Sequence, residues 1–298
     1  MNEADKVDPY HSVMSTQRHG NAAGAGVTAK GQLRPGGPVS MVRVGFDARF
    51  EDVARQVWIG RWHLPPGVQH RQPVLNYPAV NIAIEADRAA AYLPVRGLAE
   101  KILAGDGWVA GVMLRPGAGV LFVPGDHGEL LGTEAPIREA NELVRRVRGA
   151  MSGGEVADAE VATSFEDWLD PFIDRVDDEV RLVNAICDTA ERDTDLRTSR
   201  DLAERFGLSE RSLQRLLRRR VGMGPKWLLQ RRRLHAAAAR IRECPDDSFA
   251  DIAADLQYSD QAHFTRDFAS VVGCAPSAYR RSLNSPMPRR ADWQPCRS

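Results

Sequence analysis

The sequence has few cysteines and no long hydrophobic run, and both absences restrict the class of protein. Its four cysteines are far apart and form no CxxC pair, so neither a disulfide framework nor a cysteine zinc site is predicted. The apolar stretch 107–114 ends at Arg115, well before the roughly 18 residues that a membrane-spanning helix needs. The first residues lead into no apolar run, so we expect no secretory signal, no membrane partner and a cytoplasmic location.

The chain also lacks net charge, but its charges are unevenly distributed. It has 40 Lys plus Arg and 40 Asp plus Glu in 298 residues. Residues 197–298 contain 20 Lys plus Arg against 11 Asp plus Glu, a net charge of +9, and residues 1–196 therefore carry −9. A basic C-terminal third indicates a polyanionic partner such as nucleic acid, with a solvated arginine-rich surface as the alternative.

The length and a change in hydrophobic period along the chain predict two domains. We expect a β-rich, α+β N-terminal domain, of which a cupin-like barrel is one form, followed by an all-α domain. Short apolar runs separated by turns that contain Gly and Pro are typical of strands. These runs are 57–59, 80–84, 108–114 and 120–123. After Pro136 the period becomes helical, and the predicted helix ends near Gly149.

Composition and period together predict the boundaries of five segments. The first 40 residues are rich in Gly and Pro and poor in large apolar side chains, which predicts disorder. The expected segments are a disordered arm at 1–40, a β-rich domain at 41–154 that ends in a helix, a helical linker at 155–177, an all-α domain at 178–283 and a flexible tail at 284–298.

Two stretches of the helical region align with each other. They match at an offset of fifty residues and, after one inserted residue, at fifty-one: Leu202-Ala203 with Ile252-Ala253, Leu208-Ser209 with Tyr258-Ser259, Leu217 with Phe268, Val221-Gly222 with Val272-Gly273, and Pro225 with Pro276. Each copy predicts a short helix, a tight turn and a second helix, which is a helix-turn-helix pattern. We expect Ser209 and Ser259 to cap the second helices, because a serine hydroxyl accepts a hydrogen bond from an orphan backbone N–H.

The second helix of each copy has one apolar face and one polar face. Leu213 and Leu217 are four residues apart and are expected to face a core, as are Phe264 and Phe268. The opposite faces carry Arg, Gln and Thr side chains. Because the arginine fork matches guanine and the glutamine amide matches adenine, these faces suit base edges in a major groove. A solvated face is the alternative, but two aligned faces in a basic segment favour DNA binding.

Between the two copies, residues 225–242 predict a helix that starts at Pro225. Eighteen residues span about 27 Å, and successive major grooves lie about 34 Å apart, so this rod could hold the two second helices in adjacent grooves. We expect Lys226 and the run Arg231-Arg232-Arg233 to contact phosphates rather than bases.

Residues 200–281 resemble the DNA-binding domain of the AraC/XylS family of bacterial transcription regulators. The resemblance rests on the segments Leu202-Ala203, 207–211, 213–216, Gly222 and Pro225 of the first copy, and Ile252-Ala253, 258–268 and 273–280 of the second. It implies two helix-turn-helix motifs joined by a long helix. Residues 76–84 and 107–117 more weakly resemble a β-rich sensor module that is found fused to such domains.

The resemblance also implies which side chains contact DNA. Base-contacting residues would be Arg211, Gln214 and Arg215 in the first motif, and Gln261, Ala262, Thr265 and Arg266 in the second. Backbone contacts would come from Ser209, Arg218, Lys226, Ser259, His263 and Ser277. Gln257 stands where the family usually has glycine at the turn. A residue with a side chain costs roughly 1 kcal/mol in a left-handed conformation. We would therefore expect the second motif to recognise DNA bases more weakly than the first.

We therefore expect a sequence-specific DNA-binding transcription regulator that is not an enzyme and uses no cofactor. Its expected partners are double-stranded DNA and RNA polymerase, and a small-molecule effector and a second copy of the chain are further candidates. The alternative is a metal- or ligand-dependent β-barrel enzyme fused to a DNA-binding domain, with His63, His70, His127 and Glu85 as candidate ligands. No HxH pair is present, and a spacing of seven places His63 and His70 on opposite faces of a continuous strand.

A third interpretation treats the N-terminal domain as an oligomerisation or partner-binding module without a small ligand. Its larger aromatic residues would line a pocket in one interpretation and fill a core in the other. These residues are Trp58, Trp62, Tyr77, Tyr92 and Trp108.

Overall fold

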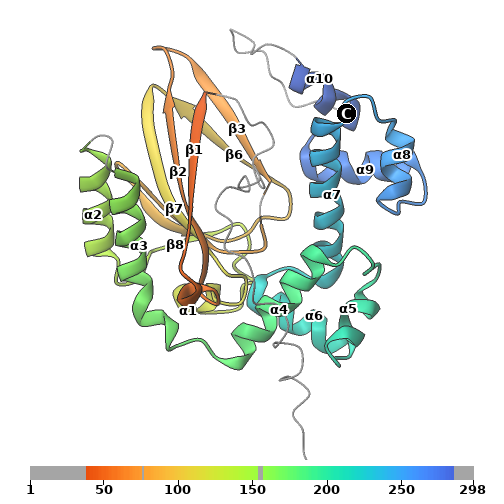
Figure 1. Ribbon diagram of the computed structural model, residues 1–298, viewed down its shortest axis with the longest axis horizontal. Coiled ribbons are helices and arrows are strands. Elements are labelled where there is room, and N and C mark those ends of the chain that lie inside the picture. Colours follow the sequence, from red (N-terminus) through yellow and green to blue (C-terminus); the bar gives the residue numbers. More distant parts are fainter. Residues whose placement is uncertain (1–37, 76, 154–156, 285–298) are drawn as a thin grey trace, which may run out of the picture.

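A computed structural model describes residues 38–75, 77–153 and 157–284 of the chain. The predicted arm at 1–40 and tail at 284–298 lie almost wholly outside these residues. A β-sheet domain forms the N-terminal half, and an array of helices forms the C-terminal half (Figure 1). None of the helices in the described ranges is both long enough and apolar enough to cross a membrane.

All the strand pairings of the N-terminal domain are antiparallel. A six-stranded sheet has the order β1-β2-β7-β4-β5-β8, and β3 pairs with β6 in a two-stranded sheet. The predicted β-rich domain is confirmed, but the described strands form an open sheet, with β1 and β8 at its two edges, rather than a closed barrel. The strands are β1 (Val39–Gly45), β2 (Ala54–His63), β3 (Gln69–Leu75), β4 (Asn81–Glu85), β5 (Ala89–Tyr92), β6 (Leu98–Ala104), β7 (Asp106–Leu114) and β8 (Glu134–Ala135).

Three of the four apolar runs lie in strands β2, β4 and β7, as predicted. The prediction is wrong for the fourth run, which forms the short helix α1 (Gly119–Phe122). A run of four apolar residues has no period that separates strand from helix. Here Phe122 packs against the rings of Trp168 and Phe172, at centroid distances of 5.1 and 4.2 Å, so a tertiary contact decides the local structure.

Helices α2 (Asn141–Met151) and α3 (Ala157–Ile173) pack together and lie side by side along the sheet domain (Figure 1). The predicted helix after Pro136 is confirmed as α2, although it begins at Asn141 and continues past Gly149. Helix α3 occupies much of the segment predicted to be a linker. Its Phe165 and Leu169 are fully buried in the same core as the sheet residues, because the apolar face of the helix covers the sheet.

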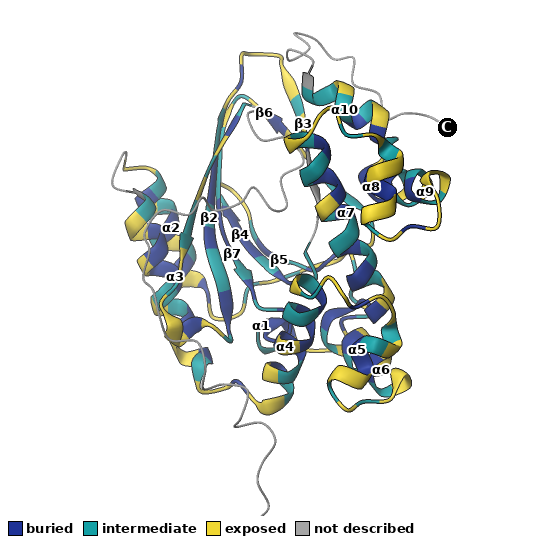
Figure 2. Cartoon of the chain, turned by 45° about the vertical axis from the view of Figure 1, so that its right-hand side comes forward, coloured by how far each residue is buried: buried dark blue, intermediate teal, exposed yellow. Residues whose placement is uncertain are grey.

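The C-terminal half consists of helices around two small cores. Leu213 and Leu217 are fully buried in the first core, and Phe264 and Phe268 in the second, so the predicted apolar faces are confirmed. Figure 2 shows buried residues where these helices meet and exposed residues on their outer sides. The helices are α4 (Asp178–Arg192), α5 (Ser199–Arg205), α6 (Glu210–Val221), α7 (Pro225–Glu243), α8 (Phe249–Asp255), α9 (Gln261–Val272) and α10 (Pro276–Asn284).

Helix α7 joins the two motifs, as the repeat predicts. It has 19 residues and begins with Pro225 in its first turn. Helices α5 and α6 lie at one end of α7, and α8 and α9 lie at the other (Figure 1). Each pair makes contacts with α7, so the long helix fixes the distance between the two motifs.

Candidate nucleic-acid interface

The first helix-turn-helix motif is built from local hydrogen bonds that its sequence specifies. Thr198 and Asp201 form a reciprocal capping box at the start of α5, and the pKa of Asp201 is lowered by its hydrogen bond with Thr198. Gly207 supplies the left-handed turn, with a φ of 62°. The hydroxyl of Ser209 then accepts from the backbone N–H of Ser212 at 3.1 Å, which confirms Ser209 as the cap of α6.

The second motif repeats this design with two differences. Gln257 occupies the turn with a φ of 61°, almost the same conformation as Gly207, although its side chain makes that conformation unfavourable. The cap of α9 is Asp260 and not Ser259, so that prediction is wrong. The Asp260 carboxylate accepts from the backbone N–H of His263 at 2.6 Å, and this hydrogen bond lowers the pKa of Asp260. The inserted residue that shifts the repeat moves the start of the helix by one position.

Ser259 has a different role from the one predicted by its alignment with Ser209. Its hydroxyl lies 3.1 Å from Nδ1 of His263 and 3.3 Å from a carboxylate oxygen of Asp260. The His263 ring also packs edge-on against Tyr258, with a centroid distance of 5.2 Å. These contacts orient His263 at the start of α9.

The polar face of α6 projects into solvent. Arg211, Gln214, Arg215 and Arg218 are all exposed, while Leu213 and Leu217 on the opposite side are fully buried. The left-handed residue Gly222 ends the helix. The structure therefore brings the three predicted base-contacting residues of the first motif onto one accessible surface.

The polar face of α9 has the same arrangement with smaller side chains. Gln261, Ala262 and Arg266 are exposed, and Thr265 is half-buried. Lys226 and Ser277, two of the residues predicted to contact the DNA backbone, are exposed and follow the prolines that begin α7 and α10. The N-terminal turns of these two helices present backbone N–H groups that favour phosphate.

The predicted phosphate contact is wrong for Arg231, because α7 turns this side chain into the molecule. Arg231 is only 4% exposed. Arg232 donates to the backbone carbonyls of Ala190, Asp193 and Leu196 at the end of α4, and so fastens α4 to α7. The guanidinium of Arg233 lies 4.8 Å from the ring centroid of Tyr258 in the second motif.

The sheet domain holds the end of α6 that is farther from the turn. The backbone N–H of His127 donates to the carbonyl of Arg219 at 2.9 Å. Helix α4 adds a second restraint, because the carboxylate of Glu179 accepts from the guanidinium groups of Arg219 and Arg220. A β-carbon on Gly222 would lie 2.6 Å from the carbonyl oxygen of His127, so the close approach requires glycine. Burial lowers the pKa of His127, whose ring bonds the carbonyl of Val123 at 2.8 Å.

A second contact connects the sheet domain to the long helix and to the second motif. The indole N–H of Trp227 on α7 donates to the backbone carbonyl of Arg96 at 3.3 Å. Two residues further along, Leu98 packs against the core of the second motif. The loop that leads into β6 thus contacts the long helix and the second motif together.

The candidate metal ligands do not come together. His63 pairs with Asp106, His70 contacts Gln72, and Glu85 accepts from Lys101. His127 is buried against Val123, as described above. Within the described ranges, no group of three or more His, Cys, Asp or Glu side chains has an arrangement that could hold a metal ion.

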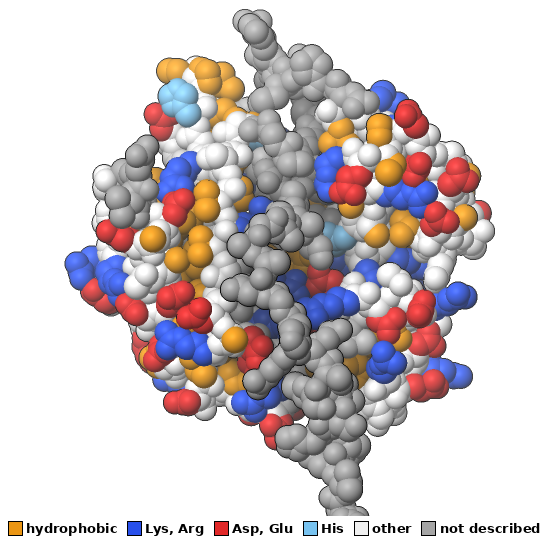
Figure 3. Space-filling model, viewed as in Figure 1, with side chains coloured by type: hydrophobic (Ala, Val, Ile, Leu, Met, Phe, Trp, Pro, Cys, Tyr) orange, Lys and Arg blue, Asp and Glu red, His pale blue; other side chains and the backbone are white. Residues whose placement is uncertain are grey.

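The charge asymmetry of the sequence does not form a single basic surface on the face that Figure 3 displays. Lys and Arg side chains are interspersed there with Asp and Glu side chains. Many arginines form ion pairs, such as Arg240 with Asp247 and Asp255. The arginines of the polar face of α6 differ from these, because Arg211, Arg215 and Arg218 have no carboxylate within salt-bridge distance among the described residues.

Comparison with known proteins gives a family match for one part of the chain. Residues 202–282 match the family described as "Helix-turn-helix domain". The HTH-type transcriptional activator RhaS of Pectobacterium carotovorum is 39% identical over 84 residues, which are 28% of this chain and 30% of RhaS. The putative HTH-type transcriptional regulator YkgA of Escherichia coli is 35% identical over 80 residues, or 27% of this chain and 33% of YkgA. The chain thus spans about a third of the length of these curated relatives.

Among solved structures, ToxT of Vibrio cholerae aligns over 83% of this chain and 98% of its own, with 13% identity and a TM-score of 0.36. The C-terminal domain of the response regulator AraT of Geobacillus stearothermophilus aligns over 40% and 96%, with 25% identity and a TM-score of 0.31.

The C-terminal half is a DNA-binding domain with two helix-turn-helix motifs joined by a long helix. More particularly, it is a domain of the AraC/XylS type, and the resemblance seen in the sequence is confirmed. Sequence reasoning missed the Thr198–Asp201 capping box, which the T-x-x-D spacing could have indicated. It also missed the contacts of the two domains, for which no local pattern exists.

Proposed function

We propose that the chain is a sequence-specific transcription regulator that inserts α6 and α9 into two adjacent major grooves. The observation that supports this most is the pair of exposed polar faces at equivalent positions of the two motifs, held apart by a single helix. A recognition helix that reads bases needs an accessible face with donors and acceptors opposite a buried apolar face. Both helices satisfy this requirement.

The residue roles follow from position on these faces. In the proposal, Arg211, Gln214 and Arg215 of α6 contact base edges, and the equivalent surface of α9 contributes Gln261, Ala262, Thr265 and Arg266. Ser209, Arg218, Lys226, Ser259, His263 and Ser277 lie near the phosphates. The reading surface of α9 has only one arginine, so we expect the second box to contribute less free energy than the first.

The sheet domain, at about 41–154, regulates the DNA-binding domain, at about 178–283, in this proposal. It contacts the end of α6, and it contacts the long helix at Trp227 and His235, so a change in the sheet domain can alter how the two motifs are presented. An effector, RNA polymerase and a second copy of the chain are the proposed partners, and the cytoplasm is the proposed location. The curated relatives named as transcriptional activators support activation as the direction of control.

The direct test is selection of bound sequences from random duplex DNA by the purified full chain at near-physiological salt, since the electrostatic part of binding depends on salt. We expect two short boxes whose centres are about one helical turn, or 10 base pairs, apart. The same selection with Arg145→Ala, a substitution of an exposed arginine on α2, should give the same boxes. If the protein enriches no sequence, or enriches one that Arg215→Ala leaves unchanged, the proposed reading is wrong.

A further inference from the structure

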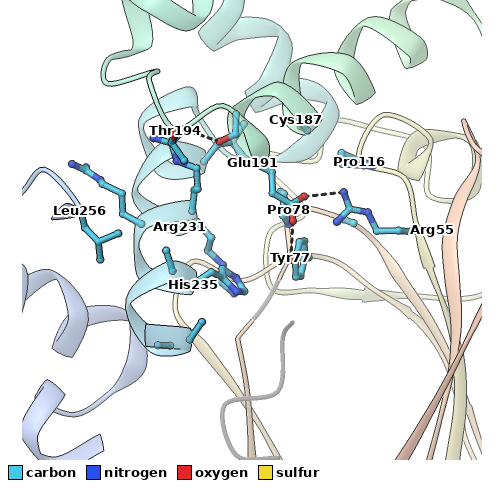
Figure 4. A pocket seen from close by; sticks show the side chains of 18 of the residues that line it. Arg55, Tyr77, Pro78, Pro116, Cys187, Glu191, Thr194, Arg231, His235 and Leu256 are labelled. Carbon is cyan, nitrogen blue, oxygen red and sulfur yellow. Dashed lines mark hydrogen bonds and ion pairs between the residues drawn. The ribbon is translucent and has the colours of Figure 1, made fainter. Parts of the chain in front are cut away.

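A pocket of about 350 Å³ lies where the sheet domain, α4 and α7 meet. Arg55 and Tyr77 reach it from the sheet domain, Cys187 and Glu191 from α4, and Arg231 and His235 from α7 (Figure 4). Asp255, Leu256 and Gln257, at the turn of the second motif, complete the wall. The sheet domain, the long helix and the second motif, which a regulator would have to couple, therefore all contribute to one cavity.

The carboxylates of the pocket already have cationic partners. Glu191 accepts from the Arg55 guanidinium at 2.8 Å and from the Tyr77 hydroxyl at 3.0 Å. Glu243 pairs with Arg242 at 3.2 Å. Asp255 pairs with Arg240. No carboxylate of the lining is left to neutralise another arginine.

Arg231 is the one buried arginine of the lining. Arg233 also lacks a carboxylate partner among the described residues, but it is partly exposed and lies over the Tyr258 ring. Arg231 is 4% exposed, and none of its three guanidinium nitrogens has a hydrogen-bond partner in the part of the chain that the structure describes. Its guanidinium makes a cation–π contact with the Trp227 ring, at 5.2 Å from the ring centroid. Burial lowers the pKa of Arg231 to about 9, so the side chain still carries its charge at neutral pH. A buried unpaired charge of this kind is costly unless a ligand supplies the opposite charge.

The rest of the lining is suited to the apolar part of a small molecule. Met113, Leu114, Leu228 and Leu256 contribute aliphatic surface. Burial raises the pKa of Cys187 to about 12, so its thiol is uncharged at neutral pH and adds no negative charge to the pocket. The Tyr77 ring lies 5.1 Å from the His235 ring, which makes one wall aromatic.

Gln257 provides an independent indication that this wall is functional. The first motif has Gly207 in the same left-handed turn, and the second accepts the backbone strain of Gln257, a residue at the wall of the pocket. Residues held in unfavourable backbone conformations tend to occur at binding sites, where the surrounding structure maintains them.

We propose that the pocket binds a small organic monocarboxylate, whose carboxylate pairs with the Arg231 guanidinium and whose apolar body packs on the aliphatic and aromatic walls. One unpaired guanidinium matches one carboxylate, and its planar fork can donate two parallel hydrogen bonds to the two oxygens. The bound molecule contacts the sheet domain, α4, α7 and the turn of the second motif together. It is thus the effector of the proposed function, because it fixes the relative position of the domain that senses and the helices that read.

The test measures ligand binding to the full chain without DNA. Thermal unfolding is followed with sodium benzoate and sodium hexanoate, and with benzamide and hexanamide as neutral controls of the same shape. We expect one or both carboxylates to raise the midpoint of the wild-type protein and the amides to have no effect. Arg231→Met should fold, have a higher midpoint than the wild type without ligand because the buried unpaired charge is gone, and bind the same carboxylate at least about tenfold more weakly. Arg242→Met, which removes a lining arginine that already has a carboxylate partner, should respond like the wild type.

Three results would overturn the proposal: no shift with either carboxylate, equal shifts with the amides, or an unchanged shift in Arg231→Met. DNA binding is measured separately, by fluorescence anisotropy on the boxes that the selection yields. A protein that selects its boxes but binds neither carboxylate contradicts only the ligand assignment. One that binds carboxylates and selects no sequence contradicts only the proposed regulator.

Discussion

The guanidinium of Arg231 lies 5.2 Å from the ring centroid of Trp227, one helical turn earlier on α7, and has no hydrogen-bond partner among residues 38–75, 77–153 and 157–284. The neighbouring Arg232 is hydrogen-bonded instead, because it donates to three backbone carbonyls in and just after the last turn of α4. Two adjacent arginines on one helix thus differ completely in their environment. This difference makes them a matched pair for experiment.

Replacing Arg231 should stabilise the protein in the absence of any ligand. Arg231→Met removes a buried charge without a partner and keeps an apolar chain of similar length, so we expect the free energy of unfolding to rise by about 1–3 kcal/mol. Arg232→Met should lower it by about 1–3 kcal/mol, because it leaves the carbonyls of α4 without donors. Urea unfolding at pH 7 checks both. Equal destabilisation by the two substitutions would contradict the environments described for them.

One arginine from each reading face, Arg215 on α6 and Arg266 on α9, should carry sequence preference. Arg215→Ala and Arg266→Ala should each cost about 1–3 kcal/mol of binding free energy and relax the preference at one base pair. Anisotropy titrations against the selected site and its single-base variants measure this. The control is Lys226→Ala, for which we expect weaker binding to every sequence and a smaller salt dependence. Uniform weakening by Arg215→Ala would assign that residue to a phosphate.

The turn of the second motif should be strained. Gln257→Gly removes a side chain from a residue with a φ of 61°, and the free energy of unfolding should rise by about 0.5–1 kcal/mol. The reciprocal substitution Gly207→Gln, in the first motif, should lower it by a similar amount. Denaturant unfolding of the two variants gives the comparison. A loss of stability in Gln257→Gly would mean that the glutamine side chain stabilises the turn by more than its backbone strain.

The cap of α9 can be assigned by a pair of adjacent substitutions. Asp260→Ala should lower the unfolding midpoint more than Ser259→Ala does, because the Asp260 carboxylate accepts the backbone N–H of His263. The pKa of Asp260 is lowered in the folded state, so its stabilisation is present at neutral pH and is lost as pH falls through that lowered value. Thermal unfolding at pH 7 and at pH 3 should therefore show a smaller difference between Asp260→Ala and wild type in acid.

Protonation of His127 should weaken the contact between the sheet domain and α6. Burial holds its folded-state pKa below the ordinary value of 6.5, so below that pH the unfolded chain binds a proton that the folded protein does not. Stability should fall as the pH drops below about 6.5, and His127→Gln should reduce this loss. Urea unfolding at pH 7.5 and 5.5 measures it, with a substitution at the exposed His63 for comparison. An unchanged pH dependence in His127→Gln would assign the effect to other groups.

The helical half was predictable because its signals are local. The spacing of Leu213 and Leu217, and of Phe264 and Phe268, sets which face of each helix is buried, and all four are fully buried. The left-handed turn at Gln257 followed from its alignment with a turn that needs glycine. The cap of α9 was misassigned because one inserted residue separates the two copies, and alignment alone could not show on which side of Ser259 the helix begins.

The residues 120–123 show what a short pattern lacks. Four consecutive apolar residues fit a strand or a buried helix equally well, and the aromatic contacts of Phe122 with α3 decide between them. The open form of the sheet likewise depends on which strands pair across long sequence distances, as β2 does with β7. Neither feature has a signal within a few residues of itself.

The sequence by itself determined the two helix-turn-helix motifs, the length of the helix between them and the polar faces that we propose contact DNA, because helix period, turns and most caps are properties of neighbouring residues. Only the tertiary structure decided which environment each of the three consecutive arginines on α7 occupies. Arg231, Arg232 and Arg233 look alike in the chain, but successive residues of a helix point about 100° apart, and the packing of α7 on α4 and the sheet domain sends each to a different environment. One of them became the unpaired charge of the interdomain pocket.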